Sequence, residues 1–129
     1  MSMILNGIGH EGAPNRLTLL WTNPAPASAF AANKTAEVDR AEYDFLLIEF
    51  LTSSSLQYVN MSVLLNDTSI ANQYISSCQG GMSVSRKVTI NAETVAFSTG
   101  YYTKGIPEGN SNGTGTTYAI PYRIYGYIV

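Results

Sequence analysis

Few residues of this chain have the chemistry of a nucleophilic or acid–base site. His10 is the only histidine, and it stands in an unpatterned N-terminal stretch, so a Ser-His-Asp or Cys-His arrangement is not expected. Cys78, the only cysteine, lacks a basic neighbour that would activate its thiol, and we interpret it as a packing residue. Glycoside hydrolysis needs two carboxylates across a cleft, but no motif singles out a pair among the nine present. We therefore expect no catalytic residues.

Metal and phosphate sites are not expected either. One cysteine and one histidine cannot supply the four ligands of a structural zinc site. The cluster Glu37, Asp39, Glu42 and Asp44 offers oxygens to calcium but lacks the alternating acidic loop of an EF-hand, so a solvated strand connection is the favoured interpretation. The Gly-rich segment 105–117 lacks the Lys-Ser/Thr of a phosphate loop. The sequence predicts no cofactor and no metal.

Composition and charge argue against several classes of protein. The chain has 129 residues, a net charge of -2 and no Lys/Arg cluster, which argues against a nucleic-acid partner. No apolar run is long enough for a membrane span, and the N-terminus lacks the features of a signal peptide. A single cysteine is consistent with synthesis in a reducing cytoplasm. We expect one domain over residues 17–129, preceded by a connector over residues 1–16.

Alternating polar and apolar residues recur in short segments bounded by Gly, Pro, Asn, Asp or Ser, the pattern of half-buried strands. Such spacing predicts an all-β fold, an antiparallel β-sandwich of jelly-roll-like form with about eight strands. The turn Asn91-Ala92-Glu93 is predicted to close a tight hairpin, and segment 105–117 to form a mobile exposed loop. The eight expected strands are Leu17–Asn23, Ala29–Val38, Tyr43–Thr52, Gln57–Leu65, Ile70–Ser76, Ser83–Asn91, Thr94–Lys104 and Tyr118–Val129.

Alternation also divides each strand into two faces. Three apolar sets are expected to line the core, and Trp21 is assigned to the core because it alternates with Leu17 and Leu19. Arg86 falls on an apolar face, which requires a position near a rim or a carboxylate partner. The core sets are Val59, Met61, Val63 and Leu65; Val84, Val88 and Ile90; and Ile120, Tyr122, Ile124 and Ile128.

The strand around residues 44–51 is apolar on both faces, so it is either a covered central strand or a strand whose outer face meets another copy. In the last strand an aromatic and cationic strip lies opposite the core residues, and such residues are enriched in interfaces. We therefore predict homo-oligomerisation. The expected interface residues are Phe45, Leu47, Leu51, Arg123, Tyr125 and Tyr127.

Nine tyrosines and one tryptophan, with many neutral hydroxyl and amide groups, are chemically suited to stacking on and hydrogen bonding to sugars. The aromatic and cationic residues that flank the Gly-rich segment are the best ligand candidates, and the alternative is that they pack at strand ends or in an interface. These candidates are Tyr101, Tyr102, Lys104 and Tyr118.

Three segments carry a resemblance to a known group: Leu20-Trp21-Thr22-Asn23-Pro24 followed by Ser28-Ala29-Phe30, Ala41-Glu42-Tyr43-Asp44 leading into Leu47-Ile48-Glu49-Phe50, and the ending Ile120-Pro121-Tyr122-Arg123-Ile124-Tyr125-Gly126. From about Leu17 onward the chain resembles the C-terminal head domains of tail fibre and minor tail receptor-binding proteins of phages and prophages of Gram-positive bacteria. The resemblance implies a sandwich at the tip of a fibre or baseplate, a homotrimer, and contact with host cell-wall saccharides. The resemblance assigns no functional residue to this chain.

These observations lead to one expectation and two alternatives. We expect a non-enzymatic phage tail fibre or tail-tip head domain that binds a host-surface saccharide and other virion tail proteins, on a virion assembled in the host cytoplasm. The first alternative is a purely structural virion component, such as a capsid decoration or tail-assembly protein. The second is a carbohydrate-degrading enzyme, which would release reducing ends from cell-wall fractions.

Overall fold

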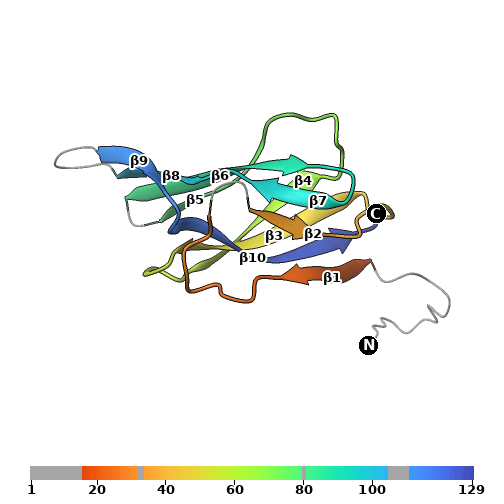
Figure 1. Ribbon diagram of the computed structural model, residues 1–129, viewed down its shortest axis with the longest axis horizontal. Coiled ribbons are helices and arrows are strands. Elements are labelled where there is room, and N and C mark those ends of the chain that lie inside the picture. The colour runs from red at the N-terminus through yellow and green to blue at the C-terminus, as the bar shows by residue number, and fades with distance from the viewer. Residues whose placement is uncertain (1–15, 32–33, 80, 105–110) are drawn as a thin grey trace.

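The computed structural model describes residues 16–31, 34–79, 81–104 and 111–129 (Figure 1). The expected connector and His10 therefore lie outside the described residues, apart from Arg16. The strands are β1 (Leu17–Thr22), β2 (Thr35–Glu37), β3 (Phe45–Ser53), β4 (Val59–Leu65), β5 (Gln73–Gln79), β6 (Met82–Ile90), β7 (Thr94–Phe97), β8 (Gly100–Lys104), β9 (Ser111–Gly115) and β10 (Tyr118–Tyr127).

The strands form two antiparallel sheets that stack as layers (Figure 1), which confirms the predicted all-β sandwich. Sheet A has the order β1-β10-β3-β4. In sheet B, β5 pairs along one edge of β6, while β7 and β8 pair in succession along the other and are themselves flanked by β2 and β9. The segment predicted as one strand over Thr94–Lys104 is thus two strands, interrupted at Ser98 and Thr99.

The strand order is jelly-roll-like in its outer part. β1 pairs with β10, and β2 with β7, so strands from the two ends of the domain are nested. Between them lie two local hairpins, β3–β4 and β5–β6. The predicted turn at residues 91–93 joins β6 to β7, and Asn91 N donates to Thr94 O at 2.9 Å. Within the described residues, no helix is long and apolar enough to span a membrane.

The core lies between the sheets and contains one of the three predicted apolar sets in full and half of a second. Leu46, Ile48 and Phe50 of β3 are fully buried, as predicted for one side of that strand. The set from β6 is also buried, and Ile120 and Ile124 of β10 are fully enclosed. Tyr122 and Ile128 are only half-buried. The pairing of β10 with β3 shifts between Pro121 and Arg123, so simple alternation does not hold through Tyr122.

The prediction that Val59, Met61, Val63 and Leu65 line the core is wrong. Their exposed fractions range from 47% to 64%, whereas Leu64 between them is buried. β4 is an edge strand, and its polar residues face the sandwich at the rim. There Asn60 Nδ2 donates to Thr52 Oγ1 at 3.0 Å, and Ser77 Oγ donates to Asn60 Oδ1 at 2.7 Å. The alternation was read correctly, but the polar side is the inner one.

Trp21 packs against the core as predicted, but by a different route. Leu17 and Leu19 of the same strand are each 50% exposed. The register of β1 against β10 shifts between Leu19 and Trp21, and this bulge turns the indole from the outer face to the inner one. Its ring then meets Phe30 edge-on, with centroids 6.3 Å apart.

Arg86 has neither the rim position nor the carboxylate partner that the sequence suggested. Its side chain is 1% exposed, and three backbone carbonyls accept its hydrogen bonds: Tyr118 O from Nε, Ser98 O from one terminal nitrogen and Thr116 O from the other, all at 2.9 Å. Burial lowers the pKa of the guanidinium to about 10. Three donated bonds satisfy most of the hydrogen-bonding capacity of the buried cation.

Part of the predicted Gly-rich loop is a strand instead. β9 pairs with β8 over its whole length. A side chain at Gly113 would lie 3.3 Å from the Tyr102 ring, and one at Gly115 would lie 3.2 Å from the Tyr118 ring. Tyrosine rings therefore take the place of the missing side chains, which gives a glycine-rich strand the packing that it otherwise lacks. Residues 105–110 lie outside the described residues.

Candidate functional site: two outer faces

The outer face of sheet A is apolar across all four strands. Cross-strand register aligns two rows over β1, β10, β3 and β4, and in each row large side chains follow one another from edge to edge. We call this surface the open face of sheet A. Its rows are Leu17, Tyr127, Phe45 and Leu65, then Leu19, Tyr125, Leu47 and Val63, and it continues with Met61 and Val59 along β4.

One polar group lies within this face. Arg123 Nε is 2.9 Å from Glu49 Oε1, and Tyr125 Oη donates to the same oxygen at 3.2 Å. Arg123 also stacks on Tyr122, with 4.2 Å between the guanidinium carbon and the ring centroid. Burial, and then the nearby Glu49 carboxylate, raise the pKa of the Tyr125 hydroxyl. The ion pair is internally matched, so it adds little net charge to the face.

The structure gathers five of the six predicted interface residues on this face. Phe45, Leu47, Arg123, Tyr125 and Tyr127 are half-buried there. The sixth residue, Leu51, is only 6% exposed and offers little surface to a partner. Sequence reasoning missed the contributions of β1 and β4, because it assigned the apolar side of β4 to the core. One sequence signal could have revealed the correct side of β4. Its apolar residues alternate strictly with polar ones, and Asn60 and Ser62 can form hydrogen bonds at the rim of a sheet.

The predicted ligand residues separate into two groups. Tyr102 and Tyr118 pack against the core with ring centroids 4.5 Å apart, and Lys104 Nζ lies 5.7 Å from the Tyr102 ring centroid. This group lies on the inner side of β8, since Tyr102 pairs with buried Val84. Tyr101 points to the other side and is 44% exposed. The structure thus favours packing as the role of Tyr102 and Tyr118.

The outer face of sheet B carries small hydroxyl groups beside Tyr101. Ser85 pairs with both Ser76 and Tyr101, and Ser83 pairs with Thr103. These residues line a shallow depression of about 560 Å³ with Cys78, whose thiol is exposed and does not have the predicted packing role. The depression has hydroxyl donors and acceptors, one aromatic ring and no charged side chain in its lining.

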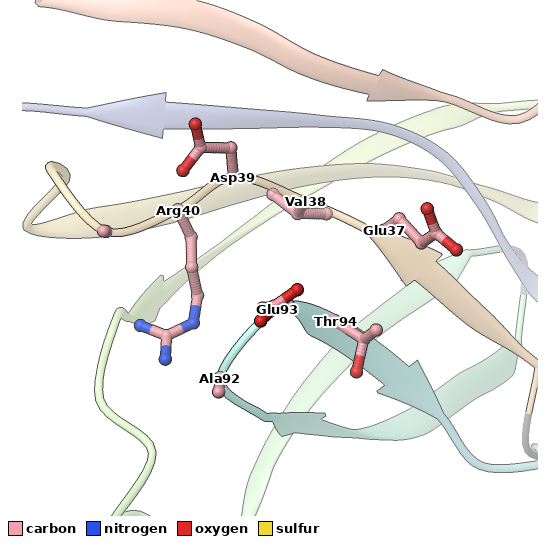
Figure 2. Close-up of a pocket in the computed structure, with 8 residues that line it drawn as sticks. Glu37, Val38, Asp39, Arg40, Ala92, Glu93 and Thr94 are labelled. Carbon is pink, nitrogen blue, oxygen red and sulfur yellow. The ribbon is translucent and has the colours of Figure 1, made fainter.

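A second depression collects part of the acidic cluster at the β6–β7 turn (Figure 2). Its volume is about 550 Å³, and it is lined by Glu37, Asp39, Arg40 and Glu93 among others. Arg40 Nε donates to Asn91 O at 2.7 Å, so its guanidinium is used in holding the turn. In Figure 2 the Glu37 and Asp39 carboxylates point in different directions rather than toward one another. Among the described residues, no group of three or more His, Cys, Asp or Glu side chains is placed to hold a metal ion.

The segment just before β3 contacts the end of β10 and the residues that follow it. A side chain at Gly126 would collide with the Tyr43 ring, so glycine is needed where that ring lies against β10. Asp44 Oδ2 accepts a hydrogen bond from Val129 N at 2.8 Å beside it.

Three comparisons with known proteins were made, and none identifies a relative of this chain. A scan against protein-family models found no match, and searches of curated proteins and of solved structures also found none. The chain is an antiparallel β-sandwich domain with two chemically different outer faces.

Proposed function

We propose that this chain is a non-enzymatic head domain of a phage tail fibre or tail tip, and that it binds a host-surface saccharide through the outer face of sheet B. The observation that carries the proposal is the uncharged depression floored by serine and threonine hydroxyls beside exposed Tyr101. An aromatic ring stacks on the apolar face of a sugar, and neutral hydroxyls exchange hydrogen bonds with its substituents.

A shallow site of this kind gives weak single contacts, and several copies on one virion compensate by avidity. The domain would be made in the host cytoplasm and carried on the phage tail, attached to other tail proteins.

The test is binding of purified protein to an array of defined neutral saccharides and to cell-wall polysaccharide fractions of Gram-positive bacteria. Tyr101→Ala should weaken binding about tenfold, as expected for loss of one stacked aromatic ring. Tyr58→Ala is the matched control, because Tyr58 is 55% exposed and lies outside the depression. Release of reducing ends from the same fractions would contradict a non-enzymatic role.

A second candidate function is a purely structural virion component that contacts only other virion proteins. The open face of sheet A favours it, because exposed apolar patches of this extent mark protein–protein contacts. Silence on every saccharide and cell-wall fraction would select this candidate.

A further inference from the structure

The open face of sheet A is costly for an isolated chain. Leu17 and Leu19 on β1, and Val63 and Leu65 on β4, are each about half exposed or more, at the two edges of the same sheet. Between them lie the half-buried Tyr and Phe side chains of β10 and β3. Scattered apolar residues are normal on a surface, but a contiguous patch across four strands is typical of a contact surface.

The flat extent of the face is smaller than a standard protein contact, but its exposed side chains add to the area that a partner can cover. The face is four strands wide and covers five residues of β10 (123–127) and seven of β4 (Val59–Leu65), which at about 4.8 Å per strand and about 3.3 Å per residue gives a flat footprint on the order of 300–450 Å². A standard interface buries about 800 Å² on each partner, and a flat footprint understates the area of protruding side chains.

We propose that the open face of sheet A packs against the same face of a second copy of this chain, forming a two-fold symmetric dimer. The apolar residues form one continuous patch on one sheet. One patch is buried on both copies when each presents it to the other, which is an isologous contact. A ring of three needs two different, complementary patches. The proposed stoichiometry therefore differs from the trimer that the resemblance implies.

The chemistry of the face also suits a partner with the same face. Two sheets stack face to face about 10 Å apart when apolar side chains interdigitate, and both copies would supply such side chains. Glu49 and Arg123 lie on neighbouring strands within the patch and carry opposite charges. Because this pair is matched within each chain, a second copy that covers the face meets no uncompensated charge there.

The test is sedimentation equilibrium of the full chain from about 1 µM to about 100 µM, a range that detects a dissociation constant near the micromolar level. We expect a particle of twice the 13.9 kDa chain mass. Val63→Lys and Leu19→Lys, made separately, should each raise the dissociation constant about 100-fold, because a tenfold loss per site acts twice in a two-fold contact.

The matched control is Tyr74→Lys, which introduces the same charge at a 52% exposed position on the outer face of sheet B. It should leave the dissociation constant unchanged, and circular dichroism should show that all three variants stay folded. A monomer over the whole range would overturn the proposal and leave the face to a different virion protein or to a chain segment outside the described residues. A trimer, or a dimer insensitive to both Val63→Lys and Leu19→Lys, would overturn it as well.

Discussion

The two outer faces of the sandwich differ in what each sheet leaves exposed. At the centre of sheet A, Leu47 lies between Tyr125 and Val63. At the centre of sheet B, Ser85 lies between Ser76 and Tyr101. Both positions alternate with buried residues, so the inner faces follow the same rule while the outer faces do not. Because the core requires only one face of each sheet, the other face is available for a chemically specific role.

This difference suits the two proposed roles, which are assembly through sheet A and ligand recognition through sheet B. An apolar outer face loses unfavourable contact with water when it is covered, so it is suited to assembly. A hydroxyl-rich outer face is stable in water and can exchange water for a polar ligand, so it is suited to recognition. In a dimer formed through sheet A, the outer faces of sheet B would point away from the contact and remain open.

The largest effect is expected from placing the same charge at the centre of each face. Leu47→Asp should lower the free energy of unfolding by about 2–3 kcal/mol, because it puts a carboxylate among half-buried apolar side chains and close to Glu49. Ser85→Asp should change it by less than about 1 kcal/mol. Urea unfolding of both variants at one protein concentration measures the difference. Equal losses would mean that the two faces are energetically alike.

A smaller effect is expected where a tyrosine ring lies on a glycine of each sheet. Gly126→Ala in sheet A should destabilise the protein by about 2 kcal/mol, because the new methyl group collides with the Tyr43 ring. Gly113→Ala in sheet B should cost less than about 1 kcal/mol, because its methyl group meets the Tyr102 ring at 3.3 Å and a small shift relieves the contact. Thermal unfolding of both variants provides the measurement, and a reversed order would contradict the contacts described here.

The smallest effect concerns the single hydroxyl bonded within the open face. The folded pKa of Tyr125 is raised above 10.0, so its contribution to stability is complete below about pH 10 and is lost as the pH rises through the folded value. Tyr125→Phe lacks this titration. The difference in melting temperature between the wild type and Tyr125→Phe should therefore become smaller from about pH 8 to about pH 11. A constant difference would indicate that the hydroxyl does not ionise against Glu49.

Much of the fold follows from the sequence, because a period of two residues identifies strands and the turn at residues 91–93 joins two of them. Alternation alone does not say which side of an edge strand is buried. In β4, Asn60 forms hydrogen bonds at the rim on the inner side, so the apolar residues of that strand face outward instead of into the core. Bulges are equally hidden from simple alternation, since the shift after Leu19 turns Trp21 inward. The glycine-rich composition of β9 predicts a loop, and the rings of Tyr102 and Tyr118 that pack on its glycines become apparent only in the folded structure.

The candidate surfaces were predictable only where alternation within a single strand identifies their residues. Phe45 and Leu47 were correctly placed opposite the buried side of β3, because their own strand shows both apolar faces. The serine floor beside Tyr101 was not predicted, since its members come from β5, β6 and β8 and become neighbours only through strand register.

The carbonyl cage around Arg86 has a consequence for the order of folding. Its three acceptors belong to residues 98, 116 and 118, all of which follow Arg86 in the chain. β10, which begins at residue 118, also lies between β1 and β3. A nascent chain that has emerged from the ribosome only as far as β6 lacks all three carbonyl acceptors for Arg86, and it also lacks the strand that joins β1 to β3. Native closure of this sandwich must therefore follow synthesis of β10, so the domain is expected to fold in one cooperative step once that strand is complete.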